Sequence, residues 1–164
     1  MDFQLPILTV LHLPEERHSQ LADVFQKRLH RRVKEAQDKE SIQPGHLYFA
    51  CPGYHLSVEL DCSLSLSQEE HVHYSRPSID ILFESAADAY GPGLVGVLLT
   101  GANEDGARGL KRIKQLGGLT VVQDPDEAKV GVMPRAALGL QIPDYILPLS
   151  GIARLLADLD KDPC

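Results

Sequence analysis

The sequence has no apolar run long enough to cross a bilayer and no excess of positive charge. Its N-terminal FQLPILTVLHL lacks the basic flank and small-residue cleavage site of a secretory signal peptide. The 16 basic residues are outnumbered by 23 acidic ones, and the net charge of −7 would repel a phosphate backbone at long range. We therefore expect a cytoplasmic protein that neither inserts into membranes nor binds nucleic acid.

Cysteine is also scarce. Cys51, Cys62 and Cys164 form no CxxC pair, and any disulfide scheme leaves one unmatched, so reduced thiols are expected. There is no internal repeat and no low-complexity segment. A chain of 164 residues that is 43% hydrophobic is long enough for one substantial core, which predicts a single domain over residues 1–164.

The N-terminal part of the sequence predicts a strand, then a histidine at the end of that strand, and then a helix. Residues 5–11 form a short, almost wholly apolar run typical of a strand covered on both faces, and His12 stands at its end. After Pro14, apolar residues recur at helical spacing over 21–29. The basic run 27–34 (KRLHRRVK) is predicted to continue this helical pattern, with its charges facing water rather than forming a docking patch.

The rest of the chain divides into hairpins and then alternating strands and helices. Short strand-like pieces over 43–74 (HLYFA, HLSVEL, HVHY), broken by Pro-Gly pairs, predict a small antiparallel hairpin extension. An amphipathic helix ending near Tyr90, with Pro77 at its first position and Asp80 in its first turn, follows. A strand (94–99), a helix (107–116) and a strand (119–123) then form a βαβ unit, before helices beginning near Arg135 and Gly151. The pattern predicts an α/β fold with a doubly wound, mostly parallel sheet flanked by helices.

Two residues that could perform chemistry follow apolar strands. His12 and Asp105 should emerge at the same edge of a parallel sheet, where open α/β sheets bind ligands. A carboxylate beside an imidazole fixes its tautomer and stabilises the imidazolium, as a general base in acyl transfer requires. Each residue also has a structural interpretation: an Asp before Gly106 and a helix is often a cap or turn residue, and a strand-end His is often merely exposed.

Other candidate groups carry weaker signals. The TGANEDG turn is neither a GxGxxG motif nor a P-loop, and its acids would repel phosphate, so no cofactor is expected. His71 and His73 would share one face of a strand, but no third ligand lies at diagnostic spacing, and no metal site is predicted. Cys51, near His55, is a candidate nucleophile, although a half-buried apolar role fits it better.

Several ordered segments resemble the catalytic domain of CheB-type chemotaxis methylesterases. They are LTVLHLP (8–14), IQPGHLYFACPGYHL (42–56), SRPSIDILFESAA (75–87), VGVLLTGANEDGARGL (95–110), VVQDPDEA (121–128) and MPRAA (133–137). The resemblance implies hydrolysis of glutamate γ-methyl esters on the cytoplasmic helices of methyl-accepting chemoreceptors, and in some relatives deamidation of glutamine. It implies a Ser-His-Asp mechanism in which His12 and Asp105 are the catalytic histidine and acid. Ala102 would supply a backbone amide at the oxyanion site, and Met133 would lie at the edge of the substrate cleft.

The chain departs from this family pattern in three places. No Gly-x-Ser-x-Gly-Gly turn is present, so the domain is predicted to be N-terminally incomplete relative to the family, without the serine. A receiver domain, which many members of the family carry, is not expected in this chain. The loop that commonly reads Gly-Met-Pro is Gly131-Val132-Met133-Pro134.

The first strand of a doubly wound sheet is normally central, so its loss would expose the ladder groups of both neighbouring strands. We expect a second copy or a rearranged sheet to fill that gap. Two further functional hypotheses stay open: a catalytically inactive binding module that docks on a receptor or signalling partner, and a hydrolase based on Cys51 with His12 or His55.

Overall fold

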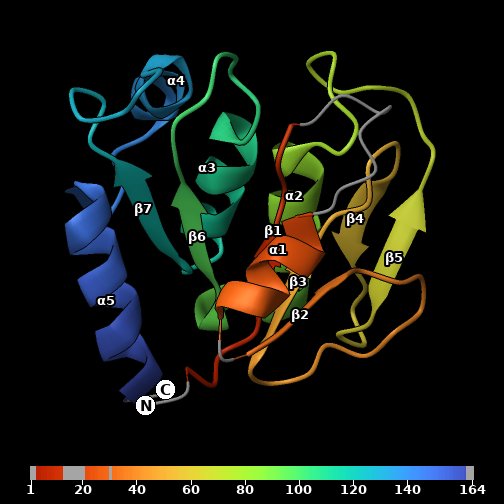
Figure 1. The fold of residues 1–164 in the computed structure, drawn as a ribbon. Helices are drawn as coiled ribbons and strands as arrows, with labels where there is room; N and C mark the ends of the chain where they lie inside the picture. Colours follow the sequence, from red (N-terminus) through yellow and green to blue (C-terminus); the bar gives the residue numbers. More distant parts are fainter. Residues whose placement is uncertain (1–2, 13–20, 30, 162–164) are drawn as a thin grey trace. The chain divides into compact units, whose positions relative to one another are not determined.

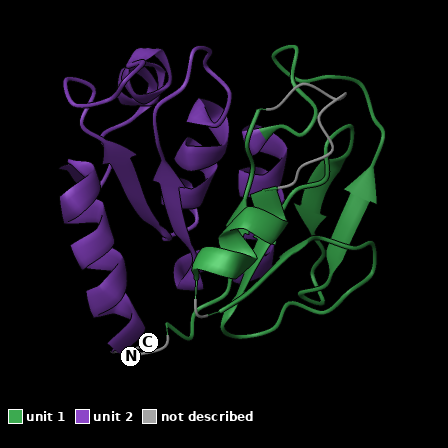
Figure 2. Cartoon of the chain, in the orientation of Figure 1, with its two compact units in different colours: residues 1–78 green, residues 79–164 purple. Residues whose placement is uncertain are grey.

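The computed structural model describes residues 3–12, 21–29 and 31–161, and the chain forms two compact units, residues 1–78 and 79–164 (Figures 1 and 2). The predicted helix before Tyr90, the βαβ unit and the terminal helix belong to the second unit. Within the described ranges, no helix is both long and apolar enough to cross a membrane.

The first unit is built on a three-stranded parallel sheet. Strand β3 (His46–Phe49) lies between β1 (Ile7–Thr9) and β2 (Arg32–Glu35), and both pairings are parallel. Helix α1 (Leu21–Arg28) packs against β2. The core of this sheet and helix is a small apolar cluster: Ala22, Val33, Leu47 and Phe49, with Ile7 against it.

Two sequence predictions for the parallel sheet of this unit are wrong. The basic run 27–34 does not continue the helix, because α1 ends at Arg28 and Arg32–Glu35 forms β2. Gln26 fixes the change of direction: its Nε2 donates to the Arg31 carbonyl, and its Oε1 accepts the Val33 N–H at 2.8 Å. The HLYFA segment is not a hairpin arm but the central parallel strand β3. Its pairing partners are distant in the sequence, so local turn signals could not reveal them.

The predicted antiparallel extension is present as one hairpin. Strands β4 (His55–Val58) and β5 (Leu64–Ser67) pair antiparallel, with Leu56 opposite Leu66. The HVHY segment, by contrast, forms a tight turn closed by a bridge between Val72 and Ser75. The prediction that His71 and His73 share one face of a strand is therefore wrong.

The second unit has a three-stranded parallel sheet in the order β6-β7-β8. In chain order its elements are α2 (Ile79–Tyr90), the 3-10 turn η1 (Gly91–Gly93), β6 (Val95–Leu98), α3 (Ala107–Gln115), β7 (Leu119–Gln123), α4 (Val132–Leu140), β8 (Tyr145–Leu147) and α5 (Leu149–Lys161). Strand β7 is central, and its residues 120–123 are all buried, as expected of a parallel strand covered on both faces.

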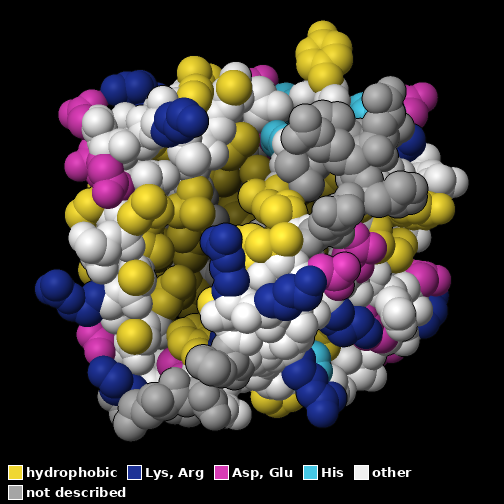
Figure 3. Space-filling view, viewed as in Figure 1, with side chains coloured by type: hydrophobic (Ala, Val, Ile, Leu, Met, Phe, Trp, Pro, Cys, Tyr) yellow, Lys and Arg dark blue, Asp and Glu magenta, His cyan; other side chains and the backbone are white. Residues whose placement is uncertain are grey.

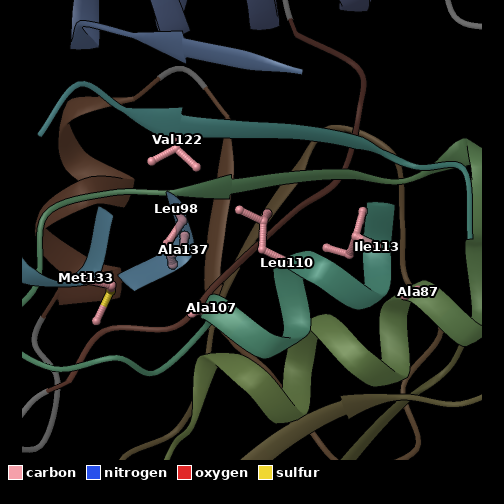
Figure 4. Packing of buried hydrophobic residues seen from close by; sticks show 8 residues of the cluster. All are labelled: Ala87, Leu98, Ala107, Leu110, Ile113, Val122, Met133 and Ala137. Atoms are coloured by element: carbon pink, nitrogen blue, oxygen red, sulfur yellow. The ribbon is translucent and has the colours of Figure 1, made fainter. Parts of the chain in front are cut away.

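One side of this sheet carries the main core (Figure 4). Leu110 and Ile113 project from α3 toward the strands, where they meet side chains of β6, β7 and α4. The buried members of the cluster are Ala87, Leu98, Ala107, Leu110, Ile113, Val122, Met133 and Ala137. This packing fixes α3, and with it the turn that precedes α3, against the carboxyl end of β6.

The structure confirms the fold class: mostly parallel sheets flanked by helices, with a small antiparallel pair. The sequence did not predict β8, a three-residue edge strand whose Tyr145 and Ile146 are 42% and 50% exposed, so it shows no burial pattern. Helices α4 and α5 begin a few residues earlier than predicted, and α2 begins at Ile79, after Pro77. Among the described residues, β1 and β6 each pair with a strand on one side only.

Candidate active site

Asp105 is fully buried, and its carboxylate binds the start of a helix. Oδ2 accepts the Ile79 N–H at 2.6 Å, and Oδ1 accepts the Asp80 N–H at 3.0 Å. The first N–H groups of a helix have no partner within the helix, so a carboxylate there satisfies two of them and lies at the positive end of the helix dipole. Asp105 is thus a helix cap, but of α2 rather than of α3, which follows it in the chain.

Asp80 makes the reciprocal contact. Its side chain is fully buried, Oδ1 accepts the Gly109 N–H of α3 at 2.7 Å, and Arg108 Nε lies 3.4 Å from Oδ2. The two helices approach closely at Gly109, where a Cβ atom would lie 2.5 Å from the Phe83 Cβ. Asp105, in the turn before α3, therefore binds the start of α2, and Asp80, in the first turn of α2, binds the start of α3.

The turn that carries Asp105 is fixed by its own hydrogen bonds and by a glycine. Asn103 Oδ1 accepts the Asp105 N–H at 3.1 Å. Gly106 has a φ of +93°, and a Cβ there would lie 2.6 Å from Leu98 Cδ1 and 2.7 Å from Ile79 Cγ2. Only glycine fits this position, which explains why Asp105 is followed by Gly106.

Ala102 follows Gly101, and Gly101 contacts Met133. Met133 donates its N–H to the Gly101 carbonyl at 3.1 Å, and the buried Met133 side chain lies so close to Gly101 that a Cβ there would be 2.6 Å from its Sδ. Thr100 adds a second tie, because its Oγ1 accepts the Val130 N–H at 2.9 Å. Ala102 itself is exposed, and no acceptor for its N–H occurs among the residues that the structure describes.

His12 belongs to the first unit. It lies three residues beyond β1, and its side chain is exposed. Asp105, Ala102 and Met133 all belong to the second unit. The juxtaposition of His12 with Asp105 stays a prediction.

Cys51 and His55 are both engaged in structural contacts. The Cys51 thiol donates to the Ala36 carbonyl at 3.3 Å, and burial, together with the charge of Glu35, raises its pKa from 9.0 to about 11. His55 is fully buried: Nε2 lies 2.9 Å from the Glu70 carbonyl, and Nδ1 accepts the Ser78 N–H at 3.2 Å. A nucleophilic cysteine needs the opposite environment, one that favours the thiolate, so these contacts argue against the Cys51 hydrolase.

The family model described as CheB methylesterase matches residues 1–156. This chain belongs to the CheB methylesterase family. It is 46% identical over 160 residues to a Leptospira interrogans protein named, provisionally, a protein-glutamate methylesterase/protein-glutamine glutaminase, a match that covers 98% of this chain and 83% of that protein. The crystal structure of the Thermotoga maritima CheB methylesterase catalytic domain matches with a TM-score of 0.90 at 30% identity, over 96% of this chain and 85% of that one.

A third relative is much longer. The Archaeoglobus fulgidus protein-glutamate methylesterase/protein-glutamine glutaminase is 36% identical over 155 residues, which cover 93% of this chain but 44% of the relative. This CheB-type chain therefore spans less than half of that relative's length.

Sequence reasoning missed the role of Asp80 in this CheB-type chain. The first-turn position of Asp80 indicated only a favourable charge near the helix start, yet the side chain is fully buried. A signal was available: Asp80 lies between Ile79 and Ile81 and at helical spacing from the apolar face, a position where an unpaired charge would be costly.

Proposed function

We propose that this chain is the greater part of a protein-glutamate methylesterase that hydrolyses glutamate γ-methyl esters on the cytoplasmic helices of chemoreceptors, releases methanol and also deamidates glutamine. The protein acts in the cytoplasm. His12 is the general base and then acid, Asp105 orients it, and the serine nucleophile comes from a segment outside residues 1–164. The observation that carries this proposal is the Asp105 carboxylate, buried beyond the carboxyl end of β6 and held by two amides.

The chemistry requires an acid that does not move. His12 takes the serine proton as the hydroxyl oxygen attacks the ester carbonyl, and then gives that proton to the departing methoxide, which leaves as methanol. Water repeats the sequence on the acyl-enzyme and frees the glutamate carboxylate. An ionised carboxylate offers about four lone-pair positions, so a carboxylate that accepts amide N–H groups can also accept an imidazole N–H. The α2 cap therefore holds the carboxylate in one orientation while it serves the imidazole.

Ala102 is suited to stabilise the negative charge that develops on the ester oxygen. Its exposed backbone sits in a turn tied on one side by the Gly101 hydrogen bonds with Val130 and Met133, so an N–H there would be held in place before the reaction. A preorganised donor of this kind needs no reorganisation as the charge forms. The side chain at position 102 makes no such bond, so alanine is compatible with the role.

The proposal also requires that the open edge of β1 and the open edge of β6 each be covered. Each strand is at the edge of its sheet among the described residues, and hydrophobic side chains gather over the second unit on the face shown in Figure 3. Uncovered edges of this kind promote pairing with another chain. For the 164-residue chain by itself we expect pairing with a second copy. Light scattering should give the mass of a dimer, and a monomer at micromolar concentration would contradict the pairing.

The alternative is a binding module without catalysis, and one observation favours it. The sequence contains no Gly-x-Ser-x-Gly-Gly turn, and Ser57, Ser65 and Ser67 lie in the antiparallel hairpin of β4 and β5. On this alternative, the chain binds chemoreceptor helices but turns nothing over.

Methanol release distinguishes the two functions. The probe is a purified, methylated chemoreceptor cytoplasmic fragment, and the chain is prepared both as residues 1–164 and with the in-frame codons that precede it in the gene. The esterase predicts methanol only from the extended form, with release abolished by His12→Gln. A stop codon directly upstream, or no methanol from the extended form, would favour the binding module.

A further inference from the structure

The turn that follows β6 is tied to the neighbouring strand by a buried glutamine. The ladder between β6 and β7 ends at the pair Leu98 and Val122. Two residues after Leu98, the Thr100 N–H donates to Oε1 of Gln123 on β7 at 2.9 Å. The Gln123 side chain is buried, with 2% of the residue exposed. A side-chain amide therefore continues the contact between the strands where the backbone of β6 has left the ladder.

The other end of the Gln123 amide fixes its orientation. Nε2 donates to Glu127 Oε2 at 3.1 Å, and the same carboxylate oxygen accepts the Leu149 N–H at the start of α5, at 2.9 Å. A carboxylate can only accept hydrogen bonds, and a backbone N–H can only donate one. Gln123 must therefore turn its NH₂ group toward Glu127 and its oxygen toward Thr100.

The loop before α4 holds the opposite side of the same turn. Thr100 Oγ1 and the Gly101 N–H both donate to the Val130 carbonyl, each at 3.1 Å. Gln123 thus acts from the strand side and Val130 from the loop side. The backbone that leads into Ala102 is fixed from both.

We propose that Gln123 is a positioning residue for the reaction: by holding the Thr100 N–H, it sets the direction of the Ala102 N–H toward the ester oxygen on which negative charge develops. This rests on the proposed function, in which the Ala102 amide stabilises that oxygen. Such a donor must lie about 2.7–3.1 Å from the charged oxygen, and a displacement of about 1 Å can cost about 100-fold in rate. Gln123, Thr100 and Ala102 all belong to the second unit, so the whole path lies within one compact unit.

The test measures methanol release by the extended form from the methylated chemoreceptor fragment over a range of substrate concentrations. Gln123→Met keeps the length of the side chain but removes the acceptor of the Thr100 N–H. The kcat should fall about 10- to 100-fold, while KM changes by less than about twofold, because the lost effect acts on the transition state.

A double variant, Gln123→Glu with Glu127→Gln, restores the contact by exchanging the two groups. The new carboxylate accepts the Thr100 N–H and the new NH₂ group, and the oxygen of the new amide accepts the Leu149 N–H. Its kcat should stay within about fivefold of wild type. A kcat as low as that of Gln123→Met would contradict the role of the acceptor.

Thr120→Val is the matched control. Thr120 is fully buried near the first residue of β7, and its Oγ1 donates to Asp144 Oδ2 at 2.8 Å. Like Gln123→Met, this substitution removes a polar contact of β7, but at the other end of the strand. Both should lower the Tm by about 2–6 °C, and only Gln123→Met should lower kcat.

Amide hydrogen exchange in the 164-residue chain gives a readout that does not depend on turnover. Gln123→Met should speed exchange of the Thr100 amide at least about tenfold, and the double variant should keep it slow. Unchanged exchange in Gln123→Met, or faster exchange with an unchanged kcat, would overturn the positioning role and leave the proposed function standing. No methanol from the wild-type extended form would overturn the proposed function, and the role of Gln123 with it.

Discussion

Replacing Asp105 should destabilise the second unit whether or not any catalysis occurs. The side chain is fully buried and accepts the Ile79 and Asp80 N–H groups. A buried hydrogen bond to a charged acceptor contributes about 1.5–3 kcal/mol. Asp105→Ala removes both bonds, so we expect the free energy of unfolding to fall by about 3–5 kcal/mol.

Asp105→Asn gives a graded comparison. The asparagine carbonyl can accept one N–H, but its NH₂ group then faces the other backbone donor. We expect a loss of about 2–3 kcal/mol, intermediate between wild type and Asp105→Ala. The assay is urea unfolding at neutral pH followed by far-UV circular dichroism, where a lower midpoint with an unchanged m-value reports a change in stability.

The matched control is Asp126→Asn. Asp126 pairs with Arg135 at 3.0 Å, but its side chain is 90% exposed, so the loss should stay below about 0.5 kcal/mol. A loss below about 1 kcal/mol for Asp105→Ala would refute the reasoning, because the carboxylate would then not hold the start of α2. The result also bears on activity: a loss of turnover in an Asp105 variant counts as catalytic only where the variant is still folded.

Three further outcomes follow from the same contacts. Gly109→Ala should lower the free energy of unfolding by about 1–3 kcal/mol, because the new methyl group clashes with Phe83. Gly139→Ala, with nothing within 4 Å of its Cβ, should raise that free energy by about 0.5–1 kcal/mol. Equal effects of the two substitutions in thermal unfolding would be inconsistent with the α2–α3 contact. Burial would raise the pKa of Asp144, but hydrogen bonds from Lys114 and Thr120 outweigh it and lower the pKa. Because Asp144 is exposed, solvent weakens these interactions, so Asp144→Asn should cost about 0.5–1 kcal/mol at pH 7, a cost that fades as the pH falls below about 4; a pH-independent difference would contradict this. With a pKa of about 11, Cys51 should react with iodoacetamide at pH 7 about 100-fold more slowly than an ordinary thiol, and rapid labelling located by mass spectrometry would disprove its burial.

The βαβ unit of the second half is predictable from the sequence because its signals are local. The apolar run before TGANEDG, the helical spacing over 107–116 and Gly117-Gly118 at the helix end each specify one element. Strand β2 escaped prediction, and β3 was predicted with the wrong pairing, for the opposite reason. Val33 and Leu47 are buried only because β2 and β3 pair with each other, and residues 32–35 read equally well as the end of a basic helix.

The candidate site also has one part that the sequence predicts and another that only the folded structure shows. Asp105 is found from its place after a strand, in a turn closed by Gly106, and the family resemblance gives it a role. Its two amide partners lie 25 and 26 residues earlier in the chain, so the α2 cap emerges only once α2 and α3 pack. Asp80 was missed although its position among apolar residues signals burial; its partners, Gly109 and Arg108, lie in α3 and meet it only in the fold.

The central claim, that Asp105 orients the His12 imidazole, is tested most directly by the ring ¹⁵N chemical shifts of His12 in the 164-residue chain and in Asp105→Asn. These shifts report which ring nitrogen carries the proton of the neutral imidazole. The account predicts that wild-type His12 holds its proton on Nδ1, facing the carboxylate, and that Asp105→Asn shifts it toward the mixture of a freely solvated imidazole. The same tautomer ratio in both proteins would contradict the account.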